Sequence, residues 1–328
     1  MEISNRETPL FVFGRLNTIE YPFYTTRMNG LLVIDKPEGL TSHDVVNRVR
    51  RILKTKRVGH TGTLDPFATG VMVILVGQAT RLAQFLDKDE KEYEALVRVG
   101  WETDTGDRTG MRTAVSGMPG EEVERIIVET DWEEVLSQFR GRIEQIPPMY
   151  SAKKVDGKKL YELARKGIAI QREPVTVNIR KLEILNSDEF RIPHSAIRIH
   201  VVCSAGTYIR TLAEDIGRAL GTGAHLEELR RTRAGRFGLS RSLTLEELVE
   251  IAEPAIALLP ATEAVAHLRQ FILPPARVEK TRNGLSSRFA GEAADGEAIQ
   301  MLDEDGDLIA VGTYNAAENT VQPKVVLV

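Results

Sequence analysis

The sequence predicts an α+β fold in two domains. Its 328 residues are more than one domain usually holds, and 42% of them are hydrophobic, which suffices for substantial cores. An uninterrupted apolar run at 71–76 and an alternating run at 93–99 are typical of strands, while apolar residues at helical spacing follow Thr41. Short strand-like runs separated by turns begin near Pro274. We therefore expect a larger α+β domain followed by a smaller region of short strands.

Helices and strands are predicted from capping residues, apolar stripes and turn residues. Thr41 and Asp44 have the spacing of a capping box, so a helix is expected from Thr41 to about Lys54. Further helices are expected over 121–128, 131–139, 158–166, from a Thr207 cap to Leu220, and after Thr244. Strands are expected over 71–76, 93–99, 175–184, 196–203, 298–302, 308–311 and 324–328.

Charge is segregated along the chain, although the net charge is only −4. The stretches 48–57, 153–166 and 230–241 are basic, whereas 121–134 and 292–307 are acidic. A run of like charges is commonly no more than a solvated face. Because each basic run stands beside a candidate site motif, the three together favour a surface that binds a polyanion such as RNA.

Composition excludes several kinds of site. Cys203 is the only cysteine, so an intramolecular disulfide and a thiolate metal cluster are excluded, and a cytoplasmic protein is the simplest inference. No apolar run approaches the length of a membrane span, and the N-terminus lacks the pattern of a secretory leader. The sequence has no glycine-rich phosphate loop and its six histidines do not cluster, so neither a cofactor nor a metal is expected.

The decapeptide GHTGTLDPFA, residues 59–68, places one carboxylate, Asp65, on a glycine-rich loop before an apolar strand. Pro66 favours extended backbone at Asp65 and the glycines permit tight turns, which would hold the carboxylate at the mouth of the strand. The same Asp-Pro pair is equally typical of a helix start, with Asp as the N-cap and Pro at the first helical position. On these residues alone both interpretations stay open.

Six blocks of sequence, in order, resemble the TruB family of pseudouridine synthases. They are GLLVIDKPEGLTS (30–42), the Asp65 decapeptide, KEYEA (91–95), TDTGD (103–107), PPMYSAKK (147–154) and CSAGTYIR (203–210), and LEELRR (226–231) follows them. Each block alone is a weak signal, but six in one order are specific. The resemblance implies a pseudouridine synthase-like catalytic domain with a mixed, largely antiparallel sheet, and a small C-terminal β-barrel of the PUA type.

The resemblance also implies which residues form the site. Asp65 is the expected catalytic carboxylate, and Arg210 can pair with it and keep it ionised in a desolvated pocket. Tyr93 is the expected stacking platform for a flipped base. Lys36 and Pro37 are expected to support the site loop.

Three further substrate-binding residues are implied in the same way. Tyr208 hydrogen-bonds in the pocket or takes part in proton transfer, Leu229 forms an apolar wall, and His60 fills the space left when the RNA loop opens. Each assignment has a structural alternative: an aromatic or leucine side chain can simply belong to the core, a loop histidine can bond to the backbone, and an arginine can sit at a helix end.

The implied activity is isomerisation of uridine to pseudouridine in the T loop of tRNA, at the position conventionally numbered 55. Substrate and product are isomers, so no redox carrier or energy source is required. The implied partner is the T-arm, with no protein partner and a monomeric enzyme. Two alternatives are a dyskerin-like enzyme that uses guide RNA and a non-catalytic RNA-binding or folding protein. A metal site at Glu102, Asp104 and Asp107 is disfavoured because their spacing matches no known metal loop.

These expectations divide the chain into four parts. Residues 1–27 form an N-terminal extension, 28–253 the catalytic domain, 254–273 a linker and 274–328 the PUA-like RNA-binding domain. Within the catalytic domain, the basic and aromatic stretch 147–172 is expected to clamp the RNA arm.

Overall fold

The computed structural model describes residues 28–86, 88–113, 118–150, 154–155, 158–159, 170–185 and 195–327. Its helical elements are α1 (Ser42–Ile52), η1 (Gly77–Phe85), α2 (Gly120–Glu129), α3 (Trp132–Ser137), α5 (Ile209–Ala219), η2 (Leu239–Arg241), α6 (Leu245–Glu250), η3 (Pro254–Ala257), η4 (Ala261–Val265) and α7 (Pro275–Arg282). Its strands are β1 (Gly30–Lys36), β2 (Val58–His60), β3 (Thr69–Val76), β4 (Lys91–Val99), β5 (Gly141–Gln145), β6 (Lys154–Val155), β7 (Lys158–Lys159), β8 (Val175–Ile184), β9 (Ala196–Cys203), β10 (Ala224–Ala234), β11 (Phe237–Gly238), β12 (Arg269–Ile272), β13 (Ser287–Arg288), β14 (Ala298–Leu302), β15 (Leu308–Asn315) and β16 (Thr320–Val326).

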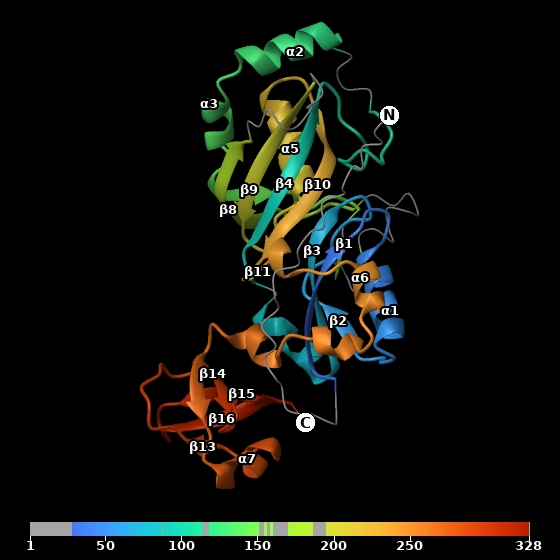
Figure 1. The fold of residues 1–328 in the computed structure, drawn as a ribbon. Coiled ribbons are helices and arrows are strands. Elements are labelled where there is room, and N and C mark those ends of the chain that lie inside the picture. Colours follow the sequence, from blue (N-terminus) through green and yellow to red (C-terminus); the bar gives the residue numbers. More distant parts are fainter. Residues whose placement is uncertain are drawn as a thin grey trace, which may run out of the picture.

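One large sheet forms the frame of the molecule (Figure 1). Its strand order is β1-β3-β10-β4-β9-β8-β5, with β2 added to β3 and β11 added to β10. Neighbouring strands in this order run antiparallel except β3 and β10, which run parallel. The prediction of a mixed, largely antiparallel sheet is therefore confirmed.

The parallel junction of β3 and β10 depends on a glycine. Gly70 has φ +104°, a conformation that side chains rarely adopt, and a Cβ atom there would lie 2.2 Å from the carbonyl oxygen of Arg231. Without a side chain, β3 can approach β10 closely enough to pair at Thr69–Arg230 and Gly70–Arg231. The loop that carries Asp65 leads directly into β3. The junction of β3 and β10 therefore fixes the position at which this loop ends.

Helices cover the sheet according to their apolar faces. α5 packs on the sheet through Leu212 and Ile216, in a core with Val97 and Ile199. α1 begins at the predicted capping box, in which Thr41 and Asp44 bond reciprocally, and it packs with α6 on β1 and β3. No helix among the described residues is long and apolar enough to cross a membrane.

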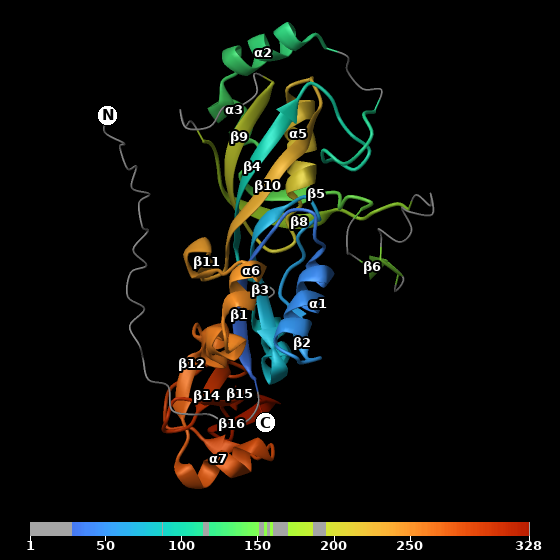
Figure 2. The ribbon, with the colours of Figure 1, turned by 45° about the vertical axis from the view of Figure 1, so that its right-hand side comes forward.

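A second sheet lies at the opposite end of the molecule from α2 (Figure 2). It has the order β12-β14-β15-β16-β13, and β12 and β14 run parallel. Its apolar residues Val311 and Val325 share one core cluster with Leu31 and Val73 of the large sheet. The two sheets are therefore packed together through apolar side chains.

Within residues 254–273, the expected linker, the first part lies against the large sheet, and β12 belongs to the second sheet. Leu259 exchanges backbone hydrogen bonds with Leu31 at 2.9 and 2.8 Å, and Ala264 and Val265 are fully buried. A chain cut at Glu253 would therefore lose part of the core that covers β1.

Several other expectations need correction. Thr207 does not cap a helix: α5 begins two residues later with Tyr208 as its N-cap, while the Thr207 hydroxyl donates to the Ser204 carbonyl. Lys158 and Lys159 form β7, so no helix begins at Lys158, and residues 160–166 lie outside the described residues. The region after Pro274 also contains a helix, α7. The extension 1–27 lies outside the described residues.

Candidate active site

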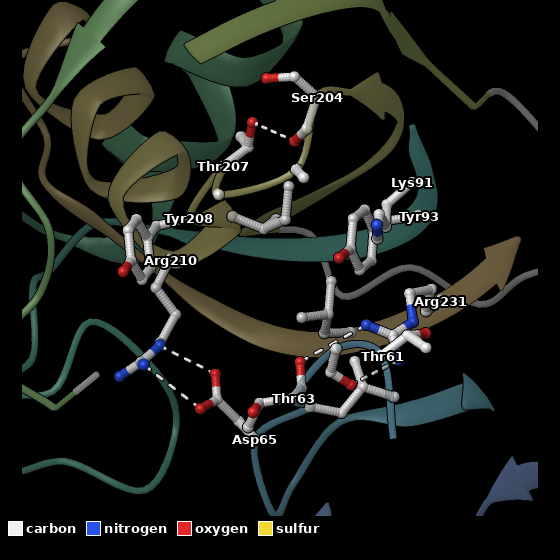
Figure 3. Close-up of a pocket in the computed structure, with 16 residues that line it drawn as sticks. Thr61, Thr63, Asp65, Lys91, Tyr93, Ser204, Thr207, Tyr208, Arg210 and Arg231 are labelled. Atoms are coloured by element: carbon white, nitrogen blue, oxygen red, sulfur yellow. Dashed lines mark hydrogen bonds and ion pairs between the residues drawn. The ribbon is translucent and has the colours of Figure 1, made fainter. Parts of the chain in front are cut away.

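A pocket opens between the Asp65 loop, strands β4 and β10, and the turn before α5 (Figure 3). Its walls include five of the predicted site residues and several others. The lining residues are Thr61, Gly62, Thr63, Leu64, Asp65, Lys91, Tyr93, Ser204, Ala205, Gly206, Thr207, Tyr208, Ile209, Arg210, Leu229 and Arg231. Segments far apart in the sequence thus place Asp65, Tyr93, Tyr208, Arg210 and Leu229 around one cavity.

The Asp65 loop is a turn that leads into a strand. The carbonyl of Asp65 accepts from the amide of Ala68 at 3.1 Å, and β3 begins at the next residue, Thr69. No helix starts at Pro66, so the N-cap interpretation of the Asp-Pro pair is wrong. The neighbouring Leu64 is tied to α1, because its amide donates to the Ser42 hydroxyl at 2.8 Å and its carbonyl accepts from that hydroxyl at 3.1 Å.

Lys36 holds this turn from behind the pocket. Its side chain is fully buried, and its ammonium group donates to the carbonyls of Leu40 at 2.7 Å, Pro37 at 3.0 Å and Pro66 at 3.2 Å. Burial lowers the pKa of Lys36 to about 8, against the opposing effect of the Asp65 charge. Neither Lys36 nor Pro37 lines the pocket, and the contact with Pro66 agrees with the expected supporting position.

Arg210 binds both oxygens of the Asp65 carboxylate, as Figure 3 shows. Its Nε lies 3.1 Å from Oδ2 and its Nη2 lies 3.3 Å from Oδ1. The same guanidinium donates to the carbonyls of Tyr150 at 2.6 Å and Thr105 at 3.0 Å. This arrangement fixes the orientation of Arg210 at the first turn of α5 and, through it, the carboxylate.

The electrostatics of Asp65 combine two opposed effects. Its side chain keeps 32% of its surface exposed, and the protein around it removes part of its hydration. Burial raises the pKa of the Asp65 carboxyl, and the positive charge of Arg210 lowers it. Burial has the larger effect, so the pKa lies above its ordinary value of 3.8.

Asp107 is a site residue that the sequence interpretation missed. Its Oδ2 lies 3.4 Å from Nη1 of Arg210, and both side chains are only 6% exposed. Its Oδ1 accepts from the Thr105 hydroxyl and the Thr109 amide, each at 2.9 Å. Asp107 lies in the TDTGD block, which indicated a shared motif but gave no role to this carboxylate. In the described part of the chain, no cluster of three or more His, Cys, Asp or Glu residues could hold a metal.

The aromatic and apolar candidates form the remaining walls. Tyr93 on β4 is 8% exposed, and Leu229 on β10 stands opposite Ala95 of the same strand pair. Tyr208 precedes α5, and its backbone is held by the side chain of Gln145 through bonds of 2.9 and 3.2 Å. The side chains of Tyr93, Leu229 and Tyr208 therefore all line the cavity.

His60 does not line the pocket. Its Nδ1 accepts from the amide of Gly62 at 3.3 Å, which matches the backbone-bonding alternative considered for it. Arg231, which the sequence placed in the LEELRR block and in a basic run without a role in the site, does line the pocket and is 2% exposed. A cationic residue in a charged sequence gives no signal that it will be buried.

The three basic runs of the sequence differ in their exposure and in their ion pairs. In the first, Arg48, Arg51, Lys54, Lys56 and Arg57 are exposed, and none of them forms an ion pair within the described residues. In the third, every arginine except Arg231 is paired with an acid: Arg230 with Asp35, Arg233 with Glu90 and Glu92, and both Arg236 and Arg241 with Glu263. Most of the second run lies outside the described residues.

Comparisons with known proteins show the family of the chain. The family description "TruB family pseudouridylate synthase (N terminal domain)" matches residues 50–209, and "tRNA pseudouridylate synthase B C-terminal domain" matches residues 210–278. A protein of Solibacter usitatus named tRNA pseudouridine synthase B is 44% identical over 311 residues, which cover 92% of this chain and 100% of that one. A protein of Bordetella avium with the same name is 48% identical over 243 residues, covering 74% and 95%.

The fold is also similar to that of a solved structure. A chain in the structure of an H/ACA RNP bound to a substrate RNA containing 2'-deoxyuridine superposes with a TM-score of 0.66 and 26% sequence identity, covering 92% of this chain and 86% of that one. The bacterial relatives are more similar in sequence and are matched over nearly their full length. The chain therefore belongs to the TruB family of pseudouridylate synthases.

Proposed function

We propose that this protein converts one uridine in the T loop of tRNA, at the position conventionally numbered 55, to pseudouridine. The observation that carries the proposal is the carboxylate of Asp65, held through both oxygens by Arg210 in a pocket that also presents Tyr93. The relatives named tRNA pseudouridine synthase B support the substrate class.

Asp65 supplies the chemistry in this proposal. The reaction breaks the bond between the sugar and the ring nitrogen and forms a bond from the sugar to a ring carbon of the same base. Attack on the sugar, attack on the ring and removal of a sugar proton all require an ionised, positioned carboxylate. Arg210 keeps Asp65 ionised and oriented, because its charge opposes the effect of burial on the carboxyl pKa.

The remaining walls receive the base after it leaves the RNA stack. Tyr93 offers an aromatic face for the flipped uracil, and Leu229 and Tyr208 close the pocket beside it. Lys36 and Pro37 keep the turn after Asp65 in place. His60 lies near the start of the Asp65 loop. We assign it the role of filling the space that is left when the T loop of the RNA opens.

The RNA backbone lies along the exposed cations of residues 48–57 in this account. The side chain of Ser42 at the start of α1 is bonded to the Asp65 loop, so α1 leads from the site to this basic surface. The stretch 147–172 clamps the RNA arm. In the described part of that stretch, Arg172 donates to the carbonyl of Pro147 at 2.8 Å and so joins its two ends.

We assign the small C-terminal sheet to a PUA-like RNA-binding domain that adds affinity. Because residues 254–265 cover β1, we place the boundary of the catalytic domain after Val265 and the smaller domain from about 266 to 328. The extension 1–27 takes no part in the site. The enzyme acts in the cytoplasm as a monomer, without a cofactor or a protein partner.

Mass mapping of pseudouridine tests this proposal. The purified protein alone is incubated with a bare T-arm hairpin and with a matched hairpin that carries cytidine at the target position. We expect one new pseudouridine, at the target uridine of the first hairpin only. A protein that modifies RNA only with a guide RNA supports the dyskerin-like alternative, and binding without any product supports the non-catalytic one.

A further inference from the structure

Arg231 occupies the centre of the large sheet. It is 2% exposed on β10, where it is paired across the sheet with Gly70 of β3 on one side and Tyr93 of β4 on the other. A guanidinium has five N–H donors and no acceptor, so its partners in this buried position determine what it does.

The partners of Arg231 in the described part of the chain are backbone carbonyls. Its Nε donates to Val71 at 2.7 Å, Nη2 to Gly62 at 3.2 Å and Nη1 to Thr63 at 3.5 Å. Gly62 and Thr63 lie just before Asp65, and Val71 lies in the strand after it. The guanidinium therefore spans both ends of the turn that carries the carboxylate. Figure 3 shows the Arg231 side chain beside the loop that contains Thr63 and Asp65.

No carboxylate among the described residues forms an ion pair with this buried charge. A buried cation held only by neutral groups is costly for stability, and an apolar residue would fill the same volume without that cost. The planar fork is, however, well suited to hold three carbonyls in one plane, which neither an apolar side chain nor a lysine can do.

Arg231 also acts on Tyr93. In an antiparallel pair, directly opposed residues place their side chains on the same face, and both side chains line the pocket. Burial raises the pKa of the Tyr93 hydroxyl, while the charge of Arg231 opposes that rise. The Arg231 guanidinium therefore places a positive charge on the same face of the sheet as the Tyr93 phenol.

We propose that Arg231 is a positioning residue of the isomerisation, which holds the backbone before and after Asp65 in a fixed position beside Tyr93. It sets the distance between the carboxylate and the aromatic platform, while Arg210 sets the charge of the carboxylate. This inference rests on the proposed function. A displacement of about 1 Å in a reacting group is enough to slow a reaction about 100-fold.

The test compares Arg231→Met with Arg230→Met. Arg230 is the adjacent residue on β10, but its side chain pairs with Asp35 outside the pocket. Rate constants are measured under single turnover with enzyme in excess over a saturating T-arm hairpin, because a loss of folded protein then leaves the rate constant of the active fraction unchanged. Hairpin affinity and melting temperature are measured in parallel.

We expect Arg231→Met to lower the single-turnover rate constant about 100-fold, with hairpin affinity near that of the wild type, and Arg230→Met to change neither. If Arg231→Met does not fold, Arg231→Lys keeps the buried charge without the fork and should show the same loss. A rate constant near that of the wild type in the folded variant would overturn the inference. An inactive wild type would overturn the proposed function as well.

A double-mutant cycle tests the link to Tyr93. Tyr93→Phe removes the hydroxyl on which the Arg231 charge acts and keeps the ring. The loss caused by Arg231→Met should therefore be smaller in the Tyr93→Phe background than in the wild type. Equal losses in the two backgrounds would show that Arg231 does not position Tyr93.

Discussion

The two ends of the pocket each contain a buried arginine, and the two arginines have different partners. Arg210 faces two carboxylates, Asp65 at 3.1 Å and Asp107 at 3.4 Å. Arg231 faces the carbonyls of Gly62, Thr63 and Val71. The same type of side chain thus stabilises an ionised carboxylate at one end of the pocket and the conformation of a backbone turn at the other. The comparison teaches that the partners of a buried charge, more than the charge itself, define its role.

The largest effect is expected from the carboxylate itself. Asp65→Asn keeps the size of the side chain and removes its charge, so the variant should fold and bind tRNA but form no detectable pseudouridine. Product formation is measured under single turnover, with tRNA binding in parallel. The control is Asp35→Asn, which removes a charge paired with Arg230 outside the pocket and should stay active. Substantial activity in Asp65→Asn would contradict the catalytic role of this carboxylate and with it the role assigned to Arg210.

The next effect should come from the partner of the carboxylate. Arg210→Met leaves Asp65 and Asp107 near each other without a cation between them, and we expect a loss of about 100-fold in the single-turnover rate. Arg218→Met is the matched control on the same helix, because Arg218 pairs with Glu102 and Asp215 outside the pocket. Comparable losses in the two variants would indicate that α5, and not the Asp65 pair, is being disturbed.

A smaller effect is expected at Tyr93. Tyr93→Phe keeps the aromatic face and should retain much of the activity, whereas Tyr93→Leu should lose stacking energy of about 1–3 kcal/mol for the flipped base. The rates and melting temperatures of both variants are compared. If the two folded variants perform equally, Tyr93 belongs to the core and is not a platform.

The smallest effect concerns the basic surface. Arg51→Gln and Arg57→Gln remove exposed charges that pair with no acid among the described residues. Each should therefore weaken tRNA binding and reduce the slope of affinity against salt by about 1, with the saturating rate kept. Arg236→Gln and Arg241→Gln are the controls, because both arginines pair with Glu263. Equal salt slopes in all four variants would contradict the assignment of the RNA surface to residues 48–57.

Most of the candidate site residues could be predicted from the sequence because each lies in a short motif, although the motifs are far apart along the chain. Asp65, Tyr93 and Arg210 lie in short blocks of distinctive residues, and the fold brings these blocks to one pocket. Asp107 and Arg231 were missed as site residues for a common reason. Each is a charged residue in a charged stretch, and only the packing of the sheet shows that both are buried.

The fold was predicted where local patterns agree with tertiary structure. Thr41 and Asp44 form the expected capping box, and β9 and β14 have the expected limits. β10 was not predicted, although it is the central strand beside the site, because its sequence AHLEELRRTRA is rich in residues that favour helices. Pairing with β3 and β4 on both sides outweighs that local preference.

The pH dependence of the single-turnover rate, measured for the wild type, Arg210→Met and Arg231→Met, tests most directly whether the two arginines differ in role. Asp65 must be ionised, so the wild-type rate should fall as the pH decreases through its raised pKa. Because Arg210 lowers that pKa, its removal should shift the acid limb to higher pH. Arg231→Met should lower the plateau and leave the acid limb in place. An acid limb that moves in Arg231→Met, or one that stays fixed in Arg210→Met, would contradict the division between charge at one end of the pocket and position at the other.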